Sequence, residues 1–120
     1  TSSGVPRIGN DWGSVNPNEP KNRRTRSAAL AWVGGESILI DAGPDLRAQL
    51  NAANIGTVDR VVITHDHADH LHGIDDLRQA AHNRGDQVPV YGRADLLERV
   101  RERFSYLFRG NALYPAVLTS

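Results

Sequence analysis

Residues 61–70 read VVITHDHADH, an apolar run followed directly by a dense group of histidines and aspartates. The apolar part predicts a buried strand, and the polar part predicts a loop at the carboxyl end of that strand. Imidazole nitrogens and carboxylate oxygens are ligands that suit zinc, iron and manganese. Because a loop can turn neighbouring side chains toward one point, we expect a metal site here, with two ions.

Four side chains of this stretch are the predicted ligands. His65 and His67 are two residues apart, so on an extended strand end they project to the same side and can bind one ion. Asp69 and His70 are adjacent at a predicted helix start and suit a second ion about 4 Å from the first. Two such ions lower the pKa of a bridging water, so the expected nucleophile is a metal-bound hydroxide held beside Asp69. The alternative is a polar loop whose histidines only cap the helix.

The neighbouring polar residues are weaker candidates. Asp66 projects away from the two loop histidines, which favours a turn or supporting role over ligation. On a helix, His72 lies about 200° around the axis from His70, and His82 lies roughly 18 Å along it, so neither is a predicted ligand. Asp41 either orients a ligand histidine or caps the helix that follows it, and we favour the first role.

Hydrophobic periodicity and turn residues predict an α/β fold. Strands are expected at 28–33, 37–40, 58–64 and 88–91, and helices at 44–53, 69–83 and 94–107. Strands that alternate with helices indicate layered α/β architecture. We therefore divide the chain into a loop-rich segment with a basic cluster (1–26), a β/α core that carries the metal loop (27–108) and an irregular tail (109–120).

The basic cluster and the composition limit the partners. Lys21, Arg23, Arg24 and Arg26 are suited to bind a substrate phosphate, and the alternative is a solvated loop. Equal numbers of acidic and basic residues argue against a strongly electrostatic polyanion binder. The chain has no cysteine, which excludes disulfides and thiolate ligands and favours a cytoplasmic location. No apolar run approaches the roughly 20 residues of a membrane span.

Several motifs resemble a known family. THDHADH (64–70) resembles the H-x-H-x-D-H signature of the metallo-β-lactamase-fold hydrolases, and DAG (41–43) resembles the short Asp motif that precedes it. TSSGVP (1–6), GNDWG (9–13), PKNRRTR (20–26) and HGIDDLR (72–78) resemble the bacterial branch related to phosphoribosyl 1,2-cyclic phosphate phosphodiesterase, with ribonuclease Z a more distant relative.

This resemblance implies a fold, a chemistry and a ligand set. The fold would be a four-layer αββα sandwich, the metals zinc or manganese, and the substrates phosphodiesters or nucleotide-like molecules. His65 and His67 would bind the first ion, Asp69 and His70 the second, and Asp41 would be the supporting acid.

A complete domain of the family is about twice as long, and its later half brings further ligands. We therefore expect this chain to be an N-terminal half, trimmed or engineered, whose exposed sheet face favours a homodimer. The functional hypothesis is a binuclear phosphodiesterase of which this chain supplies half of the site. The alternative is a self-associating, metal-binding fragment without catalysis.

Overall fold

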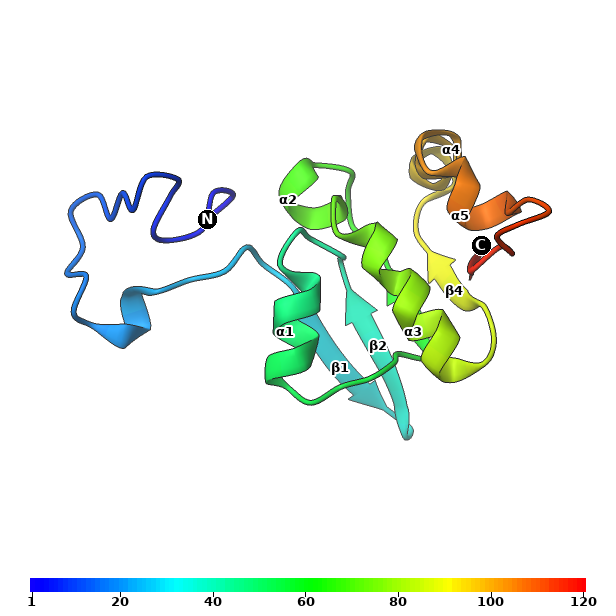
Figure 1. Cartoon of the computed structure of the whole chain (residues 1–120), viewed down its shortest axis with the longest axis horizontal. Coiled ribbons are helices and arrows are strands. Elements are labelled where there is room, and N and C mark those ends of the chain that lie inside the picture. Colours follow the sequence, from blue (N-terminus) through cyan, green and yellow to red (C-terminus); the bar gives the residue numbers. More distant parts are fainter.

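The sheet of the computed structural model, which describes residues 1–120, has five strands in the order β1-β2-β3-β4-β5 (Figure 1). The strands are β1 (Ala29–Val33), β2 (Glu36–Ile40), β3 (Arg60–Val62), β4 (Val88–Tyr91) and β5 (Leu118–Thr119). The helices are α1 (Leu46–Ala52), α2 (Ala68–Leu71), α3 (Leu77–Arg84), α4 (Ala94–Arg103) and α5 (Ser105–Arg109), with 3-10 turns η1 (Pro20–Asn22) and η2 (Ile74–Asp76). β1 is antiparallel to β2 and the other pairs are parallel. The predicted α/β class with a mixed sheet is confirmed.

A tight hairpin opens the sheet. Val33 pairs with Glu36 across a two-residue turn, and both turn residues have positive φ, +56° at Gly34 and +83° at Gly35. Glycine adopts this conformation without steric cost, so the Gly-Gly pair fixes the position of the turn. The predicted hairpin is confirmed to within a residue at each strand end.

Parallel pairing brings the polar ends of the central strands to one edge. Ile40 of β2 pairs with Val62 of β3, and Val62 pairs with Tyr91 of β4. The segments that follow these three strands therefore leave from the same edge of the sheet. Asp41 and the His/Asp loop, which are far apart in the sequence, meet there.

One face of the sheet carries the core. Leu39, Val61 and Val90 alternate toward the helices and are buried in a single cluster with apolar side chains from α1 to α5. In Figure 1, α1 and α3 lie across this face. Burying a Leu or Val side chain stabilises the fold by about 1.5–3 kcal/mol relative to leaving it exposed, so this cluster holds the sheet and helices together.

The opposite face is apolar and incompletely covered. Ile38, Ile40 and Val62 alternate away from the core residues and are half-buried, and Val33 is 60% exposed. These side chains lie on the central strands and the hairpin, where a second layer would normally bury them.

The predicted helix over 69–83 is wrong as one continuous element. The chain forms α2, then η2, then α3, and the interruption is at Gly73. The Gly73 N–H donates to the Ala42 carbonyl at 2.9 Å, and a Cβ at Gly73 would overlap the carbonyl of Gly43. The helix breaks because the backbone docks here against the segment that follows β2.

Two predictions near the carboxyl end also need correction. The predicted helix over 94–107 divides into α4 and α5 at Phe104, whose φ of −121° and ψ of 40° are not helical. The tail, predicted to be irregular, contains β5, in which Leu118 pairs with Val88 and is 1% exposed. A two-residue strand is too short to give a periodic pattern. The sequence therefore does not indicate that residues beyond 108 contribute to the apolar core.

The remaining boundaries shift by small amounts. The strand predicted over 58–64 is limited to β3, and the helix predicted over 44–53 is limited to α1. Val58 and Ile63, outside β3, remain buried, so the apolar pattern extends beyond the regular hydrogen bonding of the strand. No helix in the chain combines the length and the apolar character that a membrane span requires.

Residues 1–26 contain η1 and otherwise neither helix nor strand, and they extend from the α/β body (Figure 1). The end of this segment is fixed by Asp45, which accepts a hydrogen bond from the Arg26 N–H at 2.8 Å and pairs with the Arg26 guanidinium at 2.9 Å. Arg23 lies over the Trp12 ring at 5.1 Å. Two members of the basic cluster therefore have partners within the chain, while Lys21 and Arg24 are exposed.

Candidate metal centre

The His/Asp loop follows β3 at the carboxyl edge of the parallel strands. Ile63 is tied to β4 by its N–H, which donates to the Tyr91 carbonyl at 2.9 Å. The chain then turns through His65 and His67 and enters α2 at Ala68, which leaves Asp69 in the first helical turn. A carboxylate is stabilised at this position by the positive end of the helix dipole.

The histidines converge in space. The ring centroids of His65 and His67 are 4.7 Å apart, and those of His65 and His70 are 4.2 Å apart. Nε2 of His70 lies 3.3 Å from a carboxylate oxygen of Asp69. The four side chains predicted as ligands therefore lie in one cluster, although the sequence places two of them on a loop and two on a helix.

Asp41 is the buried acid of the cluster. Its side chain is 7% exposed, and its backbone has a φ of +67°, which is uncommon for a residue with a Cβ. The carboxylate accepts hydrogen bonds from the Thr64 N–H at 2.8 Å and from Nδ1 of His70 at 2.8 Å. Asp45, and not Asp41, precedes the first residue of α1. Of the two roles open from the sequence, this geometry corresponds to orientation of a histidine.

Thr64 links the same carboxylate to a second histidine. Its hydroxyl lies 2.8 Å from Asp41 Oδ2 and 2.8 Å from Nδ1 of His65. Because the ionised carboxylate can only accept, the hydroxyl donates to Asp41 and accepts from the Nδ1–H of His65. With Nδ1 as the donor in both rings, the neutral form of His65 and of His70 has its free lone pair on Nε2. One buried acid thus sets the tautomer of two histidines.

The donor atoms fit a metal ion. One ligand atom each from Asp41, His65 and His70 can be chosen so that all lie within 4.8 Å of one another. This set contains Asp41 in place of the predicted His67 and Asp69, which lie beside it in the same cluster. Two imidazoles with free nitrogens and adjacent carboxylates match the ligand preferences of divalent metals.

Close backbone packing holds the cluster together. The Ala42 N–H donates to the His70 carbonyl at 2.9 Å, and a Cβ at Gly43 would overlap the carbonyl of Asp69. Gly43 and Gly73 are therefore the positions where the segment after β2 meets α2. None of Gly43, Thr64 and Gly73 is a predicted site residue. The only sequence signal for them is that they lie within the motifs DAG (41–43), THDHADH (64–70) and HGIDDLR (72–78).

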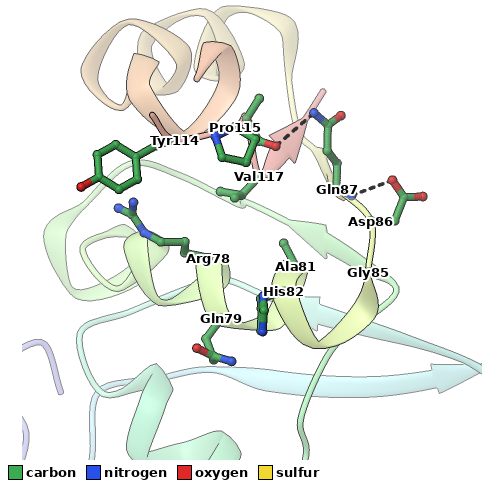
Figure 2. A pocket seen from close by; sticks show the side chains of 11 residues that line it. Arg78, Gln79, Ala81, His82, Gly85, Asp86, Gln87, Tyr114, Pro115 and Val117 are labelled. Carbon is green, nitrogen blue, oxygen red and sulfur yellow. Dashed lines mark hydrogen bonds between the residues drawn. The ribbon is translucent and has the colours of Figure 1, made fainter. Parts of the chain in front are cut away.

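The other candidates lie outside the histidine cluster. Asp66 pairs with Arg99 of α4 at 3.0 Å, and this guanidinium holds the pKa of Asp66 below its usual range. Nε2 of His72 lies 2.8 Å from an Arg103 nitrogen. His82 faces a cavity of about 610 Å³ between α3 and the chain's tail, shown in Figure 2 with Arg78, Gln87 and Tyr114 on its walls.

Comparison with known proteins gives a family match. A model of the beta-lactamase superfamily domain matches residues 36–119, which includes every residue of the cluster. Among curated proteins, an octanoyltransferase from Porphyromonas gingivalis is 39% identical over 116 residues, which are 96% of this chain and 23% of that protein. Ribonuclease Z from a Bradyrhizobium species is 33% identical over 85 residues, which are 68% of this chain and 28% of that protein.

Solved structures give the same fold. A diphosphatase from the PhnP family superposes with a TM-score of 0.80 and 37% identity, over 90% of this chain and 44% of that one. Zinc-bound PqqB from Methylobacterium extorquens superposes with a TM-score of 0.57 and 26% identity, over 67% of this chain and 28% of that one. This chain therefore spans less than half the length of each matched protein. The predicted resemblance to the metallo-β-lactamase fold is confirmed.

Proposed function

Because the chain belongs to the β-lactamase superfamily, we propose that it supplies metal ligands to a hydrolase that cleaves phosphodiesters or related phosphate bonds. The observation that carries the proposal is the convergence of three histidines and Asp69 around the buried Asp41. Two matched proteins, a diphosphatase and a ribonuclease, are named for the cleavage of phosphate bonds. The octanoyltransferase is named for a different reaction, but this chain matches only 23% of that protein.

In this proposal the cluster holds two divalent ions, zinc or manganese. His65 and His67 are ligands of one ion, and Asp69 and His70 are ligands of the other. When bound, the ions supply Lewis acidity, which lowers the pKa of water and stabilises charge on a phosphoryl oxygen. The match to a zinc-bound protein of the same fold supports the assignment of a divalent metal.

The protein's own contribution is to hold the ligands in place before a metal arrives. Asp41 fixes the ring of His70 directly and the ring of His65 through the Thr64 hydroxyl. A ligand that is already oriented loses little conformational freedom on binding, and such supporting hydrogen bonds also raise the basicity of the imidazole. Asp41 is in this proposal a supporting acid, although its carboxylate lies close enough to the two rings to contact an ion.

The ligand count favours a site completed by other protein groups. Two ions that each take four or more ligands need more than the four predicted side chains and one shared water. The remaining positions would be filled by groups from outside this chain or by further water. We propose a second copy of the chain as the source of these groups, packed through the half-buried sheet face that carries Ile38, Ile40 and Val62.

That face also supports the second candidate function, a self-associating metal-binding protein without catalysis. The two candidates share the metal ligands and the interface, and they differ only in turnover. A complete set of ligands with an open coordination position is required for catalysis, whereas a closed or half-filled site only binds metal.

Elemental analysis and an activated substrate separate these candidates. The chain would be loaded with zinc or manganese, its bound metal measured, and cleavage of bis(4-nitrophenyl) phosphate followed by absorbance. We expect bound metal and turnover above that of free metal. His67→Ala should lower the bound metal and abolish the turnover, whereas His82→Ala, at a histidine that faces the distant cavity, should keep both. Bound metal without turnover would favour the second candidate, and a chain that binds no metal would overturn both.

A further inference from the structure

We propose that Arg99 and Arg103 of α4 are positioning residues that hold the segment bearing the metal ligands in register. Arg99 Nε donates to a carboxylate oxygen of Asp66 at 3.0 Å, and an Arg103 nitrogen lies 3.7 Å from the same oxygen. A second Arg103 nitrogen lies 2.8 Å from Nε2 of His72. This inference rests on the proposed metal site, because it concerns the placement of that site's ligands.

The two arginines contact the segment on both sides of its ligands. Asp66 lies between His65 and His67 in the sequence, and His72 follows the last ligand by two residues. Arg99 and Arg103 are four residues apart on α4, so they project from the same helix face. One face of α4 therefore contacts both the loop and the end of α2, and we call this set of contacts the grip. This gives Asp66 and His72, which are not predicted ligands, a role in the site.

The position of the grip is itself fixed. Arg99 also donates to the Asp95 carbonyl at 3.2 Å and lies 3.7 Å from the Asp95 carboxylate. Leu96 and Val100, on the face of α4 that adjoins the two arginines, are buried in the core. The helix is therefore held in place independently of the arginines. The arginines in turn fix the position of the loop relative to this helix.

These contacts are better suited to position the metal ligands than to stabilise the fold. The side chains of Arg99 and Asp66 are 51% and 26% exposed, and partly exposed ion pairs contribute little to folding. Metal affinity depends more strongly on exact geometry than folding stability does, because a ligand must be held within about 0.5 Å of its productive position. Loss of the grip should therefore affect metal binding more than it affects folding.

Zinc affinity tests the proposal. Zn²⁺ would be titrated in competition with a chromophoric chelator into the wild-type chain and into Arg99→Gln, Asp66→Asn and the double variant. We expect each single variant to bind Zn²⁺ about tenfold more weakly, as for other supporting groups of metal sites. The double variant should lose no more than Asp66→Asn alone, because that variant already removes the contact of Asp66 with Arg99.

Arg101→Gln is the matched control, because Arg101 lies on the same helix but bonds to Ser120 at 2.8 Å and not to the loop. It should bind Zn²⁺ as the wild type does, and the metal-free melting temperatures of all variants should agree. Unchanged affinity in Arg99→Gln and Asp66→Asn would overturn the grip and leave the metal site standing. A loss of affinity with an equal loss of metal-free stability would also overturn it, since the role would then be general. A wild-type chain that binds no Zn²⁺ would overturn the metal site and the grip together.

Discussion

Oδ2 of Asp41 lies 2.8 Å from Nδ1 of His70, although the two residues are 29 positions apart in the sequence. The same carboxylate reaches His65 through the Thr64 hydroxyl. A single buried acid at the end of one strand thereby orients two rings that follow the next strand. The metal centre is consequently built on the pairing of β2 with β3, because that pairing brings the two strand ends together.

We expect Asp41→Asn to weaken Zn²⁺ binding by about 10- to 100-fold, the usual cost of losing a supporting hydrogen bond. The amide retains one acceptor oxygen but loses the negative charge and the second acceptor, so it cannot satisfy both Thr64 and His70. Competition with a chromophoric chelator measures the change. Asp45→Asn is the matched control, because Asp45 bonds to Arg26 and lies outside the cluster. Equal affinity in the two variants would show that Asp41 does not orient the ligands.

The sequence predicted the parts of the site that are local. The spacing of His65, His67, Asp69 and His70 is visible in one stretch, and the alternation of strands and helices predicts the sheet that carries it. The contact of Asp41 with His70 could only be offered as one of two roles, since its partner is chosen by strand order. No local pattern encodes that order.

The interruption between α2 and α3 was missed for a related reason. Leu71, Ile74, Leu77 and Ala81 keep helical spacing through the break, so their periodicity predicts one helix. The break is imposed by contacts of Gly73 with residues 42 and 43, which are 31 and 30 positions away. Tertiary backbone contacts of this kind override local periodicity and leave only an unremarkable glycine in the sequence.

Gly73→Ala tests that explanation through the free energy of unfolding. The added methyl group would overlap the Gly43 carbonyl, and the backbone cannot yield without disturbing the Ala42 hydrogen bond. We expect a destabilisation of about 1–3 kcal/mol, typical of overpacking, in urea unfolding followed by circular dichroism.

Gly56→Ala is the control for this substitution. A Cβ at Gly56 would meet only the Asn83 amide at 3.7 Å, which is ordinary contact. Its φ is negative, so alanine is tolerated and the unfolded chain loses freedom, which predicts a gain of about 0.4–1 kcal/mol. If both variants were equally stable, the close approach at Gly73 would not be the cause of the helix break.

Acid stability should depend on Asp59. Its carboxylate accepts hydrogen bonds from the Ser37 N–H at 2.8 Å and from the Ser37 hydroxyl at 3.1 Å. The backbone hydrogen bond is the main reason that the pKa of Asp59 lies below its ordinary value of 3.8. Because the folded pKa is depressed, the stabilisation is present above pH 4 or so and is lost as the pH falls through the folded pKa.

Asp59→Asn should therefore lower the melting temperature at neutral pH and reduce its decline on acidification below about pH 4. Thermal unfolding from pH 7 to pH 2 measures both effects. Asp76→Asn serves as the control, because the Asp76 side chain makes no hydrogen bond in the structure and asparagine suits its place before α3 equally well. An acid decline in Asp59→Asn as steep as in the wild type would contradict the prediction.

The half-buried sheet face should mediate self-association. Ile38 and Ile40 lie on β2, between Val62 of β3 and strand β1, so a second copy placed there would bury a continuous apolar surface. We expect light scattering at micromolar concentration to give twice the chain mass of 13.1 kDa. Ile38→Lys should shift the mass toward the monomer, because the charge would be desolvated in the interface. Leu113→Lys, at a side chain 83% exposed in the tail, should remain dimeric. A monomeric wild-type chain would exclude the second copy, and a dimeric Ile38→Lys would place the interface elsewhere.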